Sequence, residues 1–274
     1  MNHSNRPQRI HILIYSMNPI NSTFTFTFGD CAENHVGMEQ VGKLGALGSG
    51  FTLNELGSIY TNFTNAGYTC FMYDLSHVVA GAPQACVLVI KHGVDAILGT
   101  KGAKRLFDEQ AVLDVDKKAV MYNRVVNKKA RWNLCFDKEG HEPNYEEGKG
   151  RVVAYGDVPV TKQLVDSLPA WFGPKAEGLK GEANYYYDIT RCGIGFHGDT
   201  ERRKVIAARV GASLPLQYQW FQYNKPVGGR MEIPLEDADM YVMSEKAVGT
   251  DWKSSGVLTL RHATGCATFT TIKN

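Results

Sequence analysis

The stretch KVIAARVGASLPLQYQWFQ, residues 204–222, decides the fold class. It is rich in β-branched and aromatic residues, which favour strands, and Gly211 and Pro215 interrupt it with turn signals. Similar short segments surround it, at residues 151–155, 184–189, 229–234, 238–244, 257–262 and 267–273. Because many short strands without intervening helices favour a sandwich or a barrel, the sequence predicts a mainly β C-terminal half.

The N-terminal half mixes both kinds of element. Residues 22–28 read STFTFTF, and strict apolar/polar alternation is the period of a half-buried strand. Further strands are predicted at Arg9–Tyr15, Thr69–Leu75 and Ala85–Ile90, and helices at Leu53–Asn65 and Ala103–Leu113. Residues 137–150 are polar and hold three glycines and one proline, which is typical of a surface loop. We therefore expect an α+β region over residues 1–150 and a β domain over residues 151–274.

Composition indicates a cytoplasmic protein. With 274 residues, of which 43% are hydrophobic, the chain can bury at least one core. No apolar run approaches the roughly 18 residues that a membrane span needs, and the opening MNHSNRPQRI lacks the apolar centre of a signal peptide. The six cysteines are scattered singly, which favours reduced thiols over a disulfide framework. A net charge of +2 requires no polyanionic partner.

The sharpest local feature is the tripeptide that joins His197 to Asp199 within IGFHGDTE, residues 194–201. Side chains two positions apart on a strand point to the same face, so this imidazole and this carboxylate can meet one metal ion. A nonhaem Fe(II) oxygenase needs a second histidine on that face. The single histidine after Asp199 is His262, and we predict it to be the third ligand.

A keto-acid co-substrate also needs a cation for its distal carboxylate. Lys273, near the end of the predicted strand 267–273, fits this requirement, and Arg261 is the other candidate. Because side chains alternate along a strand, Arg261 and His262 should face opposite sides unless a bulge intervenes.

The order of several segments over roughly residues 150–265 resembles the AlkB branch of Fe(II)- and 2-oxoglutarate-dependent dioxygenases. The matching segments are GRVVAYG at 150–156, LPAWF at 168–172, IGFHGDTE at 194–201, residues 205–220 and DMYVMS at 239–244. The resemblance implies a double-stranded β-helix, or jelly roll, over residues 151–274, packed against the N-terminal region. It also implies bound Fe(II) and 2-oxoglutarate, and O2 as oxidant.

Two departures from the family pattern bear on the site. The family has Asn-x-Tyr about ten residues before the HxD, where we align Tyr185-Tyr186-Tyr187 and carry over only Tyr187 as a 2-oxoglutarate contact. The family's distal histidine follows a tryptophan closely, whereas this chain has Ser254 in that place. Either His262 is the third ligand with Lys273 on the co-substrate, or Asp251 closes the site and Arg261 binds the co-substrate. A third alternative is a degenerate site that binds no iron.

The implied activity is hydroxylation or oxidative dealkylation of a nucleobase in DNA, RNA or a nucleotide. Residues 117–132 interleave cations with Tyr122 and Trp132, a combination that can grip phosphates and stack on bases. The predicted substrate-binding cations are Lys128, Lys129, Arg131, Arg202 and Arg203. A solvated surface is the other reading of residues 117–132. Oxidation of a small metabolite or a protein side chain, and a binding protein without iron, remain alternatives; no protein partner follows from the sequence.

A polar loop over residues 29–39 places His35 among carboxylates. We expect it to be a surface loop whose side chains make turn hydrogen bonds, with pocket lining or metal binding as the alternative.

Overall fold

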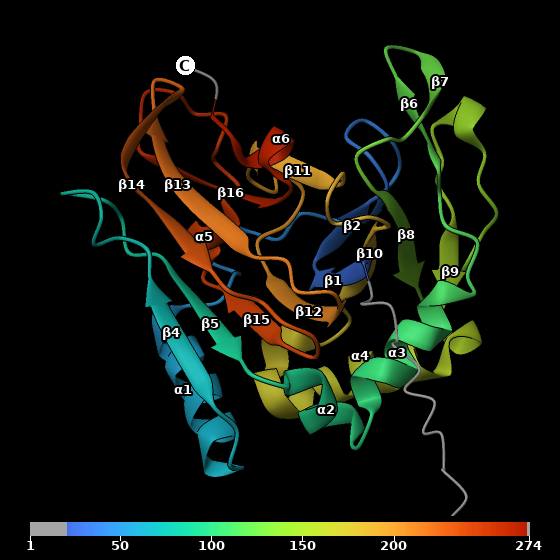
Figure 1. Ribbon diagram of the computed structural model, residues 1–274, viewed down its shortest axis with the longest axis horizontal. Coiled ribbons are helices and arrows are strands. Elements are labelled where there is room, and N and C mark those ends of the chain that lie inside the picture. The colour runs from blue at the N-terminus through green and yellow to red at the C-terminus, as the bar shows by residue number, and fades with distance from the viewer. Residues whose placement is uncertain (1–20, 273–274) are drawn as a thin grey trace, which may run out of the picture.

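The computed structural model describes residues 21–272, and most of its strands lie in two antiparallel sheets (Figure 1). The large sheet has the order β4 (Cys70–Asp74), β5 (Cys86–Ile90), β15 (Met240–Met243), β12 (Val205–Gly211), β1 (Thr23–Gly29), β10 (Lys180–Tyr186), β8 (Trp132–Asp137), β9 (Val152–Ala154). The small sheet has the order β11 (Gly193–His197), β16 (Thr259–Gly265), β13 (Leu216–Gln222), β14 (Lys225–Ile233). Only β9 joins its neighbour, β8, in parallel.

Two ribbons and several helices complete the fold. The ribbons are β2 (Cys31–Glu33) with β3 (Gln40–Gly42), and β6 (Lys118–Met121) with β7 (Arg124–Asn127). The α-helices are α1 (Leu53–Asn65), α2 (Gly93–Leu98), α3 (Gly102–Ala111), α4 (Pro159–Phe172), α5 (Glu245–Val248) and α6 (Ala267–Thr270). Short 3-10 turns are η1 (Tyr145–Glu147), η2 (Tyr155–Asp157) and η3 (Pro174–Ala176). The chain is therefore a mixed α+β protein made mostly of strands.

Strand β1 lies in the middle of the large sheet, antiparallel to both β10 and β12. Its alternation sends Phe24, Phe26 and Phe28 into the main apolar core, while the threonines between them face the small sheet. Since β10 and β12 come from the C-terminal half, the loop near residue 150 does not separate two independent sheets. The two regions that the sequence predicts share one sheet.

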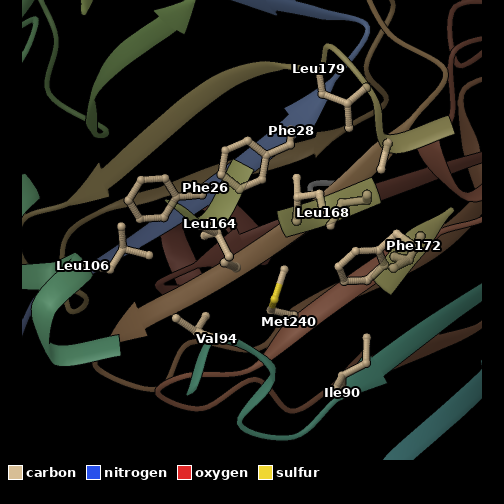
Figure 2. Packing of buried hydrophobic residues seen from close by; sticks show 14 of the residues in the cluster. Phe26, Phe28, Ile90, Val94, Leu106, Leu164, Leu168, Phe172, Leu179 and Met240 are labelled. Carbon is tan, nitrogen blue, oxygen red and sulfur yellow. The ribbon is translucent and has the colours of Figure 1, made fainter. Parts of the chain in front are cut away.

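Helices α1 to α4 cover the phenylalanine face of the large sheet (Figure 1). Figure 2 shows Phe26 and Phe28 in one cluster with Leu164, Leu168 and Phe172, which are spaced along one face of α4. Thr52 and Glu55 form a capping box that starts α1. None of the helices within residues 21–272 is long and apolar enough to cross a bilayer.

The opposite face of the large sheet packs against the small sheet. At one end the two sheets enclose a second apolar core, in which Val89 and Met243 meet Tyr218, Trp220 and Leu260. At the other end, around β1, β10 and β11, the space between the sheets stays open as a cavity. The fold therefore places one closed and one open region between the same two layers.

Several predicted elements are confirmed, and others are wrong. The helix at Leu53–Asn65 and the strands around β1, β4 and β5 match their predictions, and α3 matches within a few residues. The predicted strand at 267–273 is wrong, because residues 267–270 form α6 and β16 already has strands on both edges. Helices α2 and α4 were not predicted from the sequence, and α4 contains Pro169, a residue type that usually interrupts a helix. The predicted strand Arg9–Tyr15 and Lys273 lie outside the described residues.

Candidate metal centre

Paired strands of the small sheet bring the two predicted histidines together. His197, the last residue of β11, lies directly opposite His262 of β16, and their ring centroids are 4.5 Å apart. The register shifts between Ile194 and His197, so β11 bulges just before the histidine. Asp199 follows the end of β11, and its Oδ1 lies 3.5 Å from Nε2 of each histidine. The three ligand atoms lie within 4.8 Å of one another.

Backbone contacts fix two of these side chains. Nδ1 of His197 donates to the carbonyl of Gly195 at 2.8 Å, since a carbonyl can only accept a hydrogen bond, and Nε2 is the ring nitrogen that faces Asp199. The Asp199 N–H donates to the carbonyl of Val248 at 3.1 Å. Nδ1 of His262 is buried and has no hydrogen-bond partner among residues 21–272, so no neighbour sets the tautomer of that ring.

Gly198 permits the close turn between His197 and Asp199. A Cβ built at this position would lie 2.0 Å from the carbonyl oxygen of Gly249, which follows α5. No side chain can occupy that space without moving the backbone. The glycine of the HxD tripeptide therefore holds the two ligand residues against the segment after α5.

Local charge and burial favour the states that a metal requires at Asp199 and at His262. Burial alone would raise the pKa of Asp199, but the Arg202 guanidinium and the two imidazoles hold it well below its usual range. Burial lowers the pKa of His262, and nearby His197 lowers it further, so this imidazole stays neutral. Two neutral imidazoles and one carboxylate are the donor set of a nonhaem Fe(II) site, and the residues fit that ion.

The three groups line a cavity of about 600 Å³ between the two sheets. Its walls mix apolar side chains such as Phe196 and Met243 with buried polar groups from β1, β10 and β12. Glu33, Asn34 and His35 also line it, and Glu33 additionally accepts a turn hydrogen bond from the Gly37 N–H. The loop at residues 29–39 therefore makes the expected turn contacts and forms part of the pocket wall.

Arg202 and Arg203 do not form the exposed basic cluster that the sequence suggested. Arg202 is 4% exposed; its Nη2 lies 2.6 Å from Glu182 Oε2 and 2.5 Å from Glu201 Oε1. Its Nε is 3.6 Å from Asp199 Oδ2. Arg203 is bound to Glu245 and to the carbonyl of Gly45, away from the cavity. Both guanidiniums already have partners within the fold, which corrects their assignment as phosphate contacts.

Residues 128–131 divide between three environments. Lys128 donates to Asn34 Oδ1 at 2.7 Å and to Asn133 Oδ1, and burial lowers its pKa to about 8. Arg131 donates to Asn184 Oδ1 at 2.6 Å on the cavity wall. Lys129 is exposed. Among Lys128, Lys129 and Arg131, only Lys129 is exposed at the surface and only Arg131 lines the pocket.

The remaining predicted positions fall outside the cavity. Arg261 points away from His262, as alternation predicts; it donates to Asn224 Oδ1 at 2.8 Å and its guanidinium carbon lies 4.2 Å from the ring centroid of Phe221. Asp251 pairs with Lys246 and does not approach the two histidines, which favours His262 as the third ligand. Tyr187 stacks on Trp132 and donates to the carbonyl of Lys129, so it is not a pocket residue.

The cavity wall carries polar residues that were not predicted from the sequence, among them Asn184, Tyr186, Thr25 and Arg209. Asn184 and Tyr186 form an Asn-x-Tyr pair one residue upstream of the alignment that selected Tyr187. Thr25 and Arg209 come from neighbouring strands, β1 and β12, and lie opposite each other in the register. Arg209 could have been found from the sequence, because it stands inside the otherwise apolar strand VIAARV. A buried arginine normally has a partner, so its position there indicates a paired or ligand-binding group.

Fold and site together define a mixed α+β protein with a candidate two-histidine, one-carboxylate metal centre between two sheets. No family model matches the chain. It is 48% identical over 258 residues to the uncharacterized protein R156 of Acanthamoeba polyphaga mimivirus, an alignment that covers 92% of this chain and 99% of that protein. The chain belongs to the same family as this mimivirus protein.

Proposed function

We propose that this protein is an Fe(II)- and 2-oxoglutarate-dependent oxygenase. The observation that carries the proposal is the convergence of His197, Asp199 and His262 on one wall of a cavity. Two imidazoles and one carboxylate hold Fe(II) on one face and leave other positions for a keto acid and oxygen. When bound, the iron would supply oxidation of a substrate C–H bond, coupled to conversion of 2-oxoglutarate to succinate and carbon dioxide.

The arrangement of strands supports a double-stranded β-helix as the catalytic core. In a jelly roll two antiparallel sheets face each other. Here the sheet β11-β16-β13-β14 faces the run β15-β12-β1-β10, which would give eight strands in two layers of four. In this proposal the N-terminal strand β1 belongs to the core, so the catalytic unit extends beyond residues 151–274. The resemblance to the AlkB branch is part of the same proposal.

The chain's own groups would prepare the site in three ways. His197 and His262 would offer their Nε2 atoms, and Asp199 would offer an ionised oxygen. Arg202, paired with Glu182 and Glu201, keeps that carboxylate ionised and restrains its second oxygen. Apolar side chains on the wall, including Phe196 and Met243, would exclude water from the reacting groups.

A nucleobase in a nucleic acid or nucleotide remains the proposed substrate. Support comes from the hairpin of β6 and β7, which projects from the body of the protein (Figure 1). Its tip residue Tyr122 is 94% exposed, with exposed Lys118, Arg124 and Lys129 on the same hairpin and just after it. Cations beside an exposed aromatic ring suit a single strand, with phosphates on the cations and a base on the ring. These residues replace Arg202 and Arg203 in the proposal.

Metal content after anaerobic loading with Fe(II) tests the metal centre. We expect about one ion per chain in the wild type and none retained in His197→Ala, Asp199→Ala or His262→Ala, because each variant leaves two ligands. Asp251→Ala is the matched control and should bind normally, since Asp251 lies outside the cluster. Metal binding that survives His262→Ala and is lost in Asp251→Ala would reject this ligand set.

Succinate formation from 2-oxoglutarate then tests the chemistry. The assay should cover methylated oligonucleotides, nucleosides, common metabolites and peptides, because it separates a nucleic-acid substrate from a small molecule or a protein side chain. Some oxygenases convert 2-oxoglutarate to succinate slowly in the absence of substrate. A metal-loaded protein that forms no succinate, either with these compounds or without them, would instead be a binding protein.

A further inference from the structure

Arg209 is a fully buried cation that forms no ion pair with any residue between 21 and 272. Its relative exposure is 0%, and Nε, Nη1 and Nη2 all lack a hydrogen-bond partner within the part of the chain that the structure describes. A guanidinium cannot shed its charge near neutral pH. Burying it unpaired is strongly unfavourable, so a partner from outside the chain is the physical expectation.

Nearby acidic groups are already engaged. Asp239, the carboxylate that acts most strongly on Arg209, accepts from Lys91 Nζ at 2.5 Å and from the N–H groups of His92 and Glu236. The backbone N–H of Arg209 donates to the backbone carbonyl of Asp239 at 2.8 Å, while the Asp239 carboxylate makes no hydrogen bond to the Arg209 guanidinium. Among the cavity-lining arginines of residues 21–272, Arg131 and Arg202 have partners, and the Arg209 guanidinium has none.

A second unsatisfied group lies beside this cation. Thr25 is opposite Arg209 in the pairing of β1 with β12, and its Oγ1 is buried with no hydrogen-bond partner in residues 21–272. Both residues line the cavity that holds the candidate metal-ligand cluster. Tyr186 and Tyr241 line it too, and both interact electrostatically with the Arg209 guanidinium. A guanidinium presents two parallel donors and a hydroxyl adds a third, an arrangement suited to a carboxylate.

We infer that Arg209 and Thr25 form the binding site for the distal carboxylate of a dicarboxylic keto acid whose other end reaches the metal-ligand cluster. This inference rests on the proposed function and names the anchor for its co-substrate. The anchor comes from β12, the strand directly after the HxD turn, rather than from the segment that follows His262. Arg261, the other described candidate, contacts Asn224 and Phe221 instead.

Equilibrium binding under anaerobic conditions with Mn(II) in place of Fe(II) tests the inference. The probes are 2-oxoglutarate, glutarate, which lacks the keto group, and pyruvate, which lacks the second carboxylate. Wild-type protein should bind 2-oxoglutarate most tightly, and glutarate should compete for the site even without metal. Arg209→Met should weaken 2-oxoglutarate binding roughly 100-fold, because it removes the buried charge partner. Arg261→Met is the matched control and should bind 2-oxoglutarate as the wild type does.

Thermal unfolding without ligand shows whether Arg209 is merely structural. Arg209→Met removes an unpaired buried charge and should leave the melting temperature unchanged or higher, while glutarate should raise that of the wild type. Unchanged 2-oxoglutarate affinity in Arg209→Met, or wild-type protein that binds pyruvate as tightly as 2-oxoglutarate, would overturn the inference. If the wild-type protein binds glutarate but does not bind Mn(II), the proposed oxygenase function is rejected and the Arg209 carboxylate site still stands.

Discussion

Two buried arginines line the same cavity and differ in every contact. Arg202 lies among Glu182, Asp199 and Glu201 and is satisfied by the protein itself. Arg209, on the next strand, has no hydrogen bond or ion pair to its guanidinium among the described residues. A buried cation can therefore serve two ends: Arg202 stabilises a cluster of carboxylates that includes Asp199 of the candidate metal centre, and Arg209 is, in our proposal, available to a bound carboxylate. Burial alone therefore does not tell a structural arginine from a binding one.

The largest expected effect is on stability at Arg202. Arg202→Met should lower the free energy of unfolding by about 3–5 kcal/mol, because it leaves Glu182, Glu201 and Asp199 buried without their cation. Urea denaturation followed by circular dichroism measures it. Arg209→Met is the matched variant and should lose little or nothing. Equal losses in the two variants would mean that Arg209 has a partner within the fold and would remove the contrast.

A smaller effect is expected where the HxD turn meets the segment after α5. Gly198→Ala should cost about 1–3 kcal/mol of folding free energy, since its Cβ would collide with the Gly249 carbonyl. Moving that backbone would also displace Asp199 from His197, so metal affinity should fall with stability. Calorimetric titration with Mn(II) and urea denaturation measure the two effects.

Gly195→Ala provides the control for that turn. At Gly195 an added Cβ would have its nearest neighbour at 3.5 Å, the carbonyl of Phe269, which is an ordinary contact. This variant should retain both stability and metal binding. If both glycine variants behave alike, the close approach to Gly249 does not position Asp199.

The smallest effect concerns Lys128, a partly buried cation whose nearest partners are neutral amides. Its pKa falls from 10.5 to about 8 because of burial, so between about pH 8 and 10.5 the unfolded chain binds a proton that the folded chain has lost. The free energy of unfolding should therefore rise with pH across that window, by about 1–2 kcal/mol after allowance for solvent screening.

The difference between wild type and Lys128→Met, measured in urea at pH 7.5 and pH 9.5, isolates this contribution from other titrating lysines. The variant lacks the amine and should show a flatter pH dependence. If the free energy of unfolding changes with pH equally in the two proteins, then Lys128 does not have a lowered pKa in the folded state.

Local patterns determined much of the fold. The TFTFTF alternation defines β1, and the capping box with its apolar spacing defines α1. Both signals lie within a few residues, where backbone geometry sets the period of side-chain directions. The strand pattern of the C-terminal half likewise predicted a mainly β layer. Helix α4 was not predicted because Pro169 lies within it. The strand predicted at 267–273 is wrong because strand propensity does not reveal whether a sheet edge is free to accept another strand.

The sequence by itself also predicted the candidate metal-ligand set, because the HxD spacing and one remaining histidine left few combinations, and the structure brings His197, Asp199 and His262 together. Which groups surround that set was decided only by tertiary structure. Pairing of β1 with β12 put Thr25 beside Arg209 across a long stretch of chain, and no local pattern encodes such a pairing. The partners of Arg202 likewise come from two different segments, so its basic sequence neighbourhood was misleading. The sequence shows which charged residues a segment contains. Whether a ligand can contact those charges depends on which of them remain unpaired after the sheets pack together.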